Sequence, residues 1–112
     1  MKNPQSVTWR GESGAEYTYW QYPRGTNFDG KQPGNFILAK QTSPGHFVPI
    51  YIGQSNDLND GISNNAKKSC IDLNGATHLH VHVSQPNLLE RIREVDDLIA
   101  RWKPVCNTVR PG

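Results

Sequence analysis

Residues 34–55 read GNFILAKQTSPGHFVPIYIGQS, and this stretch decides the fold. Its two apolar runs, GNFILAK (34–40) and FVPIYI (47–52), are rich in the β-branched and aromatic residues that favour strands. Between them TSPG (42–45) offers turn chemistry, because proline fixes φ and glycine tolerates a positive φ. The stretch therefore predicts a β-hairpin in which Phe36 and Tyr51 lie near one another on adjacent antiparallel strands.

The flanking sequence predicts two further strands and a first helix. Residues 16–23 and 77–83 alternate in side-chain character as strands do, and the glycines between 25 and 34 indicate a loop. A helix is expected over residues 57–68, with Ser55 or Asn56 as its N-cap, although its interior is poor in helix-forming residues.

The last predicted element is an amphipathic helix. Ser84 is expected to cap it, Pro86 suits its first turn, and Lys103-Pro104 is expected to end it. Apolar residues recur at intervals of three and four and predict one buried stripe: Leu88, Ile92, Val95, Ile99 and Trp102.

These elements predict an α+β fold, a small antiparallel β-sheet flanked by α-helices, in a single domain over residues 1–112. Residues of about 1–33 are expected to form a strand and loop extension, and residues of about 34–107 the core. The net charge of +2 is not the strongly basic balance that by itself indicates nucleic-acid binding.

Compartment is inferred from what the chain lacks and from its cysteines. No apolar run approaches the ~20 residues of a membrane helix, and the N-terminus has no secretory signal, so a cytoplasmic protein without a membrane partner is expected. Cys70 and Cys106 suit that setting as reduced thiols, and whether they pair is left open.

The paired GNF and YIGQS segments resemble the signature of the GIY-YIG nucleases, in particular small bacterial and phage members. Further likeness lies in GATHLHVH (75–82), DLI (97–99) and PVCN (104–107). The resemblance implies a site of two tyrosines, an arginine, a metal-binding glutamate and an asparagine. In such a site a cation and a guanidinium stabilise the negative charge that develops during phosphodiester cleavage.

Most of that site is absent when the family pattern is carried onto this chain. Tyr51 and Asn107 match it, whereas Phe36, Gly61 and Val95 stand where the family has a tyrosine, the arginine and the glutamate. The resemblance therefore implies a degenerate active site from which catalysis has been lost.

The function expected on this basis is non-catalytic binding of nucleic acid or a nucleotide-type phosphate ligand, in a sequestering or decoy role. The expected ligand-binding residues are Tyr51, Lys67, Lys68 and Asn107. No cofactor is expected in this case.

Two alternatives stay open. The first is an active endonuclease, in which Mg²⁺ or Mn²⁺ binds Glu94 near Tyr51, or in which other acids supply the carboxylates: Asp57, Asp60 or Asp96. The second is a protein–protein interaction module that uses the former active-site face.

Other residue groups have both a functional and a structural interpretation. His78, His80 and His82 share one face of a predicted strand and suggest zinc, yet they span about 13 Å. The pairs Lys67-Lys68 and Arg91-Arg93 suit phosphates or solvated helix faces equally. Three tryptophans are better explained by packing than by base stacking: Trp9, Trp20 and Trp102.

Overall fold

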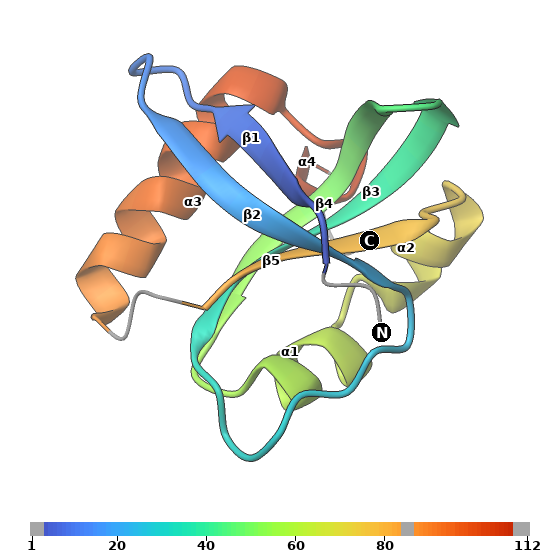
Figure 1. The fold of residues 1–112 in the computed structure, drawn as a ribbon, viewed down its shortest axis with the longest axis vertical. Coiled ribbons are helices and arrows are strands. Elements are labelled where there is room, and N and C mark those ends of the chain that lie inside the picture. The colour runs from blue at the N-terminus through green and yellow to red at the C-terminus, as the bar shows by residue number, and fades with distance from the viewer. Residues whose placement is uncertain (1–3, 84–86, 109–112) are drawn as a thin grey trace.

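The structure, a computed structural model, describes residues 4–83 and 87–108. One antiparallel sheet of order β1-β2-β5-β3-β4 contains β1 (Ser6–Arg10), β2 (Glu16–Pro23), β3 (Gly34–Ser43), β4 (His46–Ser55) and β5 (His78–His82). The helices are α1 (Leu58–Ser63), α2 (Lys68–Leu73), α3 (Leu88–Trp102) and α4 (Val105–Thr108). Helix α3 lies on one side of the twisted sheet, and α1 and α2 lie on the other (Figure 1). The predicted α+β class with an antiparallel sheet and flanking helices is confirmed.

The predicted hairpin is confirmed as β3 and β4. Phe36 pairs with Gly53, and Leu38 pairs with Tyr51, so Phe36 and Tyr51 do lie on adjacent antiparallel strands. Gly45 in the turn has a φ of 79°, a conformation that glycine adopts without steric cost.

Two strands of the sheet precede residue 34. The strand predicted over residues 16–23 is confirmed as β2, which pairs with β5, the middle strand of the sheet. Strand β1 was not predicted separately and pairs along its whole length with β2. Residues 6–10 and 16–23, within the expected N-terminal extension, are therefore part of the sheet.

Alternation along the strands gives the sheet two apolar faces. The side covered by α1 and α2, which we call the α1 face, contains a buried cluster of strand and helix residues that includes Phe36, Leu38, Leu58, Ile71, Leu79, Val81 and Cys106. The side covered by α3, which we call the α3 face, contains a second such cluster, made of Trp9, Tyr19, Ile37, Ala39, Ile52, Val95 and Leu98.

The single helix predicted over residues 57–68 is wrong, because the structure has two short helices there. Asn65 separates them: its side-chain oxygen accepts a hydrogen bond from the Lys67 backbone N–H at 2.7 Å, and its amide donates to the Gly61 carbonyl. Asparagine favours such local bonds over helix continuation.

The predicted N-caps of this segment are also wrong. The residue at the N-cap of α1 is Asp57, and its side chain makes no capping bond. Ser55 instead accepts a hydrogen bond from the Asp57 backbone N–H at 3.0 Å, and Asn56 accepts one from a side chain of α3.

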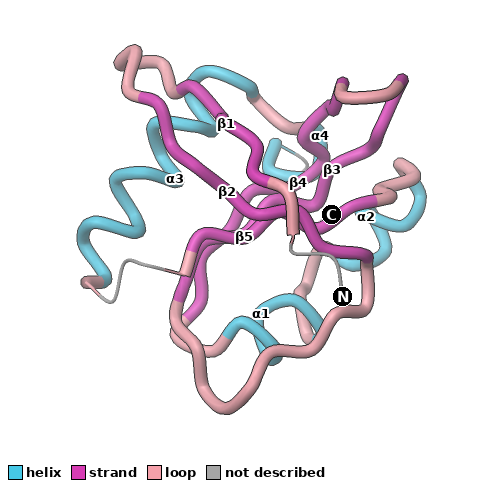
Figure 2. Tube along the Cα trace, in the orientation of Figure 1, coloured by secondary structure: helices cyan, strands magenta, loops and turns pink. Residues whose placement is uncertain are grey.

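A long loop, residues 24–33, joins β2 to β3 and runs around α1 (Figure 2). The Asn59 side chain holds it by accepting from the Phe28 backbone N–H at 2.8 Å and donating to the Phe28 carbonyl at 2.6 Å. The Leu58 backbone N–H donates to the Gln32 carbonyl. These bonds fix the loop, and with it Arg24, beside α1.

Helix α3 buries a different face from the predicted one. Val95 is 8 % exposed, as expected, but Leu88 and Ile92 are exposed, while Arg91 and Glu94 are buried. The sheet beneath the first half of α3 presents polar side chains, so hydrogen bonding decides which residues of that half are buried.

The ends of α3 confirm part of the prediction. Ser84 and Pro86 lie outside the described residues, and the observed N-cap is Asn87, which accepts from the backbone N–H groups of Leu89 and Glu90. The helix stops at Trp102 as expected, with Lys103 in the left-handed conformation at a φ of 45°.

Cys70 and Cys106 form a disulfide, with their Cα atoms 5.8 Å apart. The sequence left this pairing open with reduced thiols as the default, and the structure pairs them because the fold brings α2 and α4 together on the α1 face. Within residues 4–83 and 87–108, no helix has the length and apolar character needed to cross a membrane.

Candidate functional site

The α1 face contains a pocket of about 220 Å³ between the end of β2 and the α1–α2 segment. It is lined by Arg24, Gly25, Leu38, Ile62, Ser63, Lys68 and Leu79. The two leucines come from adjacent strands and are buried, so they form an apolar floor. The two cations and the Ser63 hydroxyl supply the polar part of the lining.

The cations of this pocket differ in how they are held. The Arg24 guanidinium donates to Asp72 at 2.8 Å and to the Ala76 carbonyl at 3.2 Å, which fixes its position and partly neutralises it. Lys68 is exposed and has no ion-pair partner within the described part of the chain. Lys68 is thus the cation available to an anionic ligand.

Tyr51 lies in the same cross-strand row as the pocket floor. Leu79 pairs with Leu38, and Leu38 pairs with Tyr51, so the three side chains follow one another across β5, β3 and β4. The Tyr51 ring is half-buried at 6.0 Å from the Phe36 ring. Its hydroxyl has no hydrogen bond to any described residue, and it remains available to a ligand.

Gly53 gives these two rings their space. A Cβ atom at position 53 would stand 2.8 Å from the Tyr51 ring and 2.9 Å from the Phe36 ring. The close packing of these two rings therefore requires glycine at position 53.

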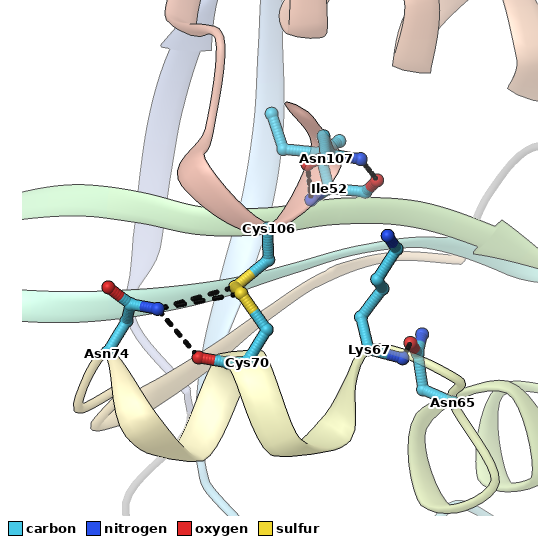
Figure 3. The surroundings of a disulfide bond; sticks show 7 residues. All are labelled: Ile52, Asn65, Lys67, Cys70, Asn74, Cys106 and Asn107. Atoms are coloured by element: carbon cyan, nitrogen blue, oxygen red, sulfur yellow. Dashed lines mark hydrogen bonds between the residues drawn. A yellow bond between two sulfur atoms is a disulfide. The ribbon is translucent and has the colours of Figure 1, made fainter. Parts of the chain in front are cut away.

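Lys67 and Asn107 are the two other predicted ligand-binding residues. The Lys67 side chain extends from the start of α2 toward β4 (Figure 3). Asn107, however, uses its whole amide on the β4 backbone: its oxygen accepts from the Ile52 N–H, and its nitrogen donates to the Ile52 carbonyl, both at 2.8 Å. Asn107 thus completes an edge strand, and the disulfide of Cys106 holds it there.

Position 61, where the family resemblance expects an arginine, has no room for a side chain. A Cβ atom on Gly61 would stand 2.5 Å from the Ser55 Cβ and 2.6 Å from its Oγ. Helix α1 packs this closely on the end of β4 because residue 61 is glycine.

Glu94, the candidate metal ligand, lies on the α3 face and is 5 % exposed. One of its oxygens accepts from the Tyr19 hydroxyl at 2.6 Å and from the Asn35 amide at 2.8 Å. The same oxygen lies 2.9 Å from His82 Nδ1. Burial acts to raise the pKa of this carboxyl, but the hydrogen bonds from His82, Tyr19 and Asn35 outweigh it and lower the pKa.

Glu94 and Tyr51 therefore do not form one site. The Glu94 carboxylate is enclosed with residues of the α3 face, whereas the Tyr51 side chain packs on the α1 face with Phe36. Val95, which replaces the expected glutamate, is also on the α3 face. Tyr51 and Lys68 lie on the α1 face, whereas the Glu94 carboxylate lies across the sheet.

Arg91 and Arg93 differ in their surroundings. Arg91 is 1 % exposed and donates to the side chains of Gln54 at 3.3 Å and Asn56 at 2.6 Å. Arg93 is exposed and lies near Glu90. Of the two arginines, only the second has the solvent access that a phosphate contact needs.

The three β5 histidines have separate environments. His80 is fully buried and accepts from the Trp9 indole N–H at 3.0 Å, while burial and the nearby His78 lower its pKa to about 4. His82 faces Glu94, and His78 packs edge-on against Phe47. Among the described residues there is no group of three His, Cys, Asp or Glu side chains placed to hold a metal.

The remaining candidate carboxylates do not come together in one site. Asp57 sits at the N-cap of α1, Asp60 accepts from the Asn64 amide at 2.7 Å, and Asp96 is exposed on α3. They lie on two helices on opposite faces of the sheet.

Sequence reasoning missed Arg24 and the residues around Glu94. A signal for Arg24 was present: Trp20 and Tyr22 belong to one face of the strand that ends at Pro23, and Arg24 follows them at the same spacing of two residues. No comparable pattern marks Tyr19 or Asn35, because only the packing of α3 brings Glu94 to them.

Comparisons with protein-family models, with curated proteins and with solved structures find no match for this chain.

Proposed function

We propose that this chain is a non-catalytic domain that binds a phosphate-bearing ligand, nucleic acid or nucleotide, on its α1 face. The observation that carries the proposal is the pocket in which Arg24 and Lys68 stand over an apolar floor, in a row with Tyr51. Two cations over an apolar floor, with the Tyr51 ring in the same cross-strand row, suit a phosphate attached to a sugar and a base. Binding without cleavage would sequester the ligand.

The pocket size favours a piece of a polynucleotide over an enclosed small molecule. Its volume of about 220 Å³ is below the roughly 300–1,000 Å³ of pockets that bury a drug-sized ligand. A phosphate and its sugar fit this space, and the base lies outside it. Nucleic acid is therefore the preferred form of the ligand, with a free nucleotide as the smaller alternative.

Three features support binding without catalysis. The Glu94 carboxylate is buried on the opposite face and already accepts from Tyr19 and Asn35. Gly61 leaves no space for a guanidinium, and Phe36 has no hydroxyl. A group that stabilises the transition state commonly contributes 10²–10³ in rate, so the loss of several leaves little activity.

We also propose that the fold is a degenerate GIY-YIG nuclease fold. The pairing of Leu38 with Tyr51 and of Phe36 with Gly53 supports this, because the two signature segments then stand side by side in one hairpin. The order of hairpin, helical segment, strand and long helix also supports this, although two short helices stand where the resemblance implies one.

Calorimetric titration with single-stranded DNA, duplex DNA and a nucleoside triphosphate tests the proposal. Lys68→Ala is expected to weaken binding roughly tenfold, as for loss of a charge-assisted contact, and Tyr51→Phe to weaken it less. Arg93→Ala, which removes the same charge from the α3 side, is the matched control and should leave affinity unchanged. Affinity should fall as salt rises.

Two results would contradict the proposed phosphate site. Equal affinity in wild type, Lys68→Ala and Tyr51→Phe, or binding that ignores salt, removes the α1-face pocket as a phosphate site. The interpretation as a protein–protein interaction module then takes precedence.

A further inference from the structure

Trp20 differs from the other two tryptophans in its surroundings. The indole N–H of Trp9 donates to His80 and that of Trp102 to the Arg10 carbonyl, so both rings are tied into the fold. Trp20 is 42 % exposed, and its N–H has no hydrogen bond within the described residues. A large ring with an unpaired donor on the surface is not explained by packing.

Trp20 and Tyr22 lie on the α1 face, the face that carries the Lys68 pocket. Trp20 pairs with Val81 and Tyr22 pairs with Leu79, and both partners belong to the apolar cluster of that face. Leu79 is also part of the pocket floor. The two rings therefore stand beside the proposed phosphate site, on neighbouring positions of one strand face.

Two hollows lie beside these residues. Trp20 and Tyr22 line a shallow depression, and Arg24 and Lys68 line the pocket described above. Arg24 follows Tyr22 by two residues along the chain. The four residues therefore follow one another along a path from Trp20 through Tyr22 and Arg24 to Lys68.

We propose that this path binds single-stranded nucleic acid, with bases stacked on Trp20 and Tyr22 and the backbone held by Arg24 and Lys68. The inference rests on the proposed function. It adds that the ligand is single-stranded and names the residues that contact its bases and its backbone. Rings combined with cations along a groove are the general means of holding single strands without regard to sequence.

The spacing of the rings decides against a duplex. Residues two apart on a strand are about 7 Å from one another, whereas stacked bases of a duplex follow at 3.4 Å along each strand. Only bases that have left a stack can meet rings spaced twice as far apart. Tyr22 is held in place by an edge-on contact with Phe28, with the ring centroids 5.3 Å apart.

Tryptophan fluorescence with an oligothymidylate of about 12 nucleotides tests the inference, a length within the range that single-strand-binding folds cover. The single strand is expected to quench wild-type emission and to bind about tenfold more tightly than its duplex with the complementary strand. Trp20→Phe should lose most of the quenching and keep most of the affinity. Trp20→Ala should weaken single-strand binding about tenfold.

The control is Trp102→Phe, which changes a partly exposed tryptophan of α3 on the other side of the sheet. It should leave quenching and affinity unchanged. Circular dichroism of each variant confirms that the comparison is between folded proteins.

The outcomes separate this inference from the proposed function. If Lys68→Ala weakens binding but Trp20→Ala does not, or if the duplex binds as well as the single strand, the stacking path is refuted and the phosphate site stands. If the wild type binds neither form of DNA nor the nucleotide, both are refuted.

Discussion

The Tyr19 hydroxyl donates a 2.6 Å hydrogen bond to the Glu94 carboxylate beneath α3. Both side chains are buried, and burial together with the Glu94 charge raises the pKa of Tyr19 well above its usual value. The phenol therefore stays protonated and remains a donor. Glu94, which the sequence suggests as a metal ligand, therefore holds α3, the longest helix, on the sheet.

Glu94→Gln is expected to lower the free energy of unfolding by about 2–3 kcal/mol near neutral pH, because hydrogen bonds to a charged acceptor are lost. The folded-state pKa of Glu94 lies below its usual 4.5, so its contribution is complete above that pH and is lost as pH falls through the folded value. Urea unfolding of both proteins between pH 7 and pH 3 should show the difference shrinking with acid. A difference that stays constant over this range would contradict the anchor role.

No cleavage of single- or double-stranded DNA beyond a buffer blank is expected with Mg²⁺ or Mn²⁺. Glu94 is enclosed, and Gly61 and Phe36 lack the groups that the chemistry needs. Gel assays of wild type and Glu94→Gln with each metal provide the measurement. Metal-dependent nicking by the wild type that Glu94→Gln abolishes would establish the active endonuclease instead.

The hairpin and the strands β2 and β5 were predictable because the signals are local. Alternation in residues 16–23 and 77–83 and the turn at Gly45 each fix a strand or its end without reference to the rest of the chain. The break between α1 and α2 depends on side-chain bonds of Asn65 to nearby backbone, which propensities only hint at.

The buried face of α3 was not predictable from its apolar stripe. Leu88 and Ile92 fit the stripe, but the sheet opposite the first half of the helix offers Asn35 and His82, which bury Glu94 instead. The disulfide is a similar case, because only the folded topology shows that α2 and α4 meet.

His80 is expected to make stability fall between pH 6.5 and pH 4. Its folded-state pKa is lowered to about 4 from 6.5, so the unfolded chain takes up a proton in this window that the folded chain does not. The corresponding loss is on the order of 3 kcal/mol. Denaturant titrations at several pH values should show this loss of unfolding free energy for wild type and for His46→Gln, an exposed control. The unfolding free energy of His80→Gln should depend less on pH over the same range.

Gly61→Ala is expected to destabilise the protein by about 1–3 kcal/mol, as overpacking does, although the same change in a free helix position stabilises by roughly 1 kcal/mol. The reason is the 2.5 Å approach of the new Cβ to the Ser55 Cβ. Thermal unfolding measures the sign directly. Ser63→Ala in the same helix, where the side chain is exposed, should be neutral or slightly stabilising, and a stabilised Gly61→Ala would show that position 61 has room.

Reduction of the Cys70–Cys106 disulfide is expected to lower the free energy of unfolding by roughly 2–4 kcal/mol. The bond closes a loop with a sequence separation of 36, and opening it restores conformational freedom to the unfolded chain. In the folded chain it ties α4 to α2 and so keeps the Asn107 amide on the backbone of Ile52. Amide exchange at Ile52 should therefore rise with reductant more than exchange at Ile37, which lies within the sheet on β3.

A double variant with serine at both cysteines should unfold at the same denaturant concentration with or without reductant. If the wild type is also indifferent to reductant, or if thiol titration of the unreduced protein finds two free thiols, the disulfide does not hold α4 in place.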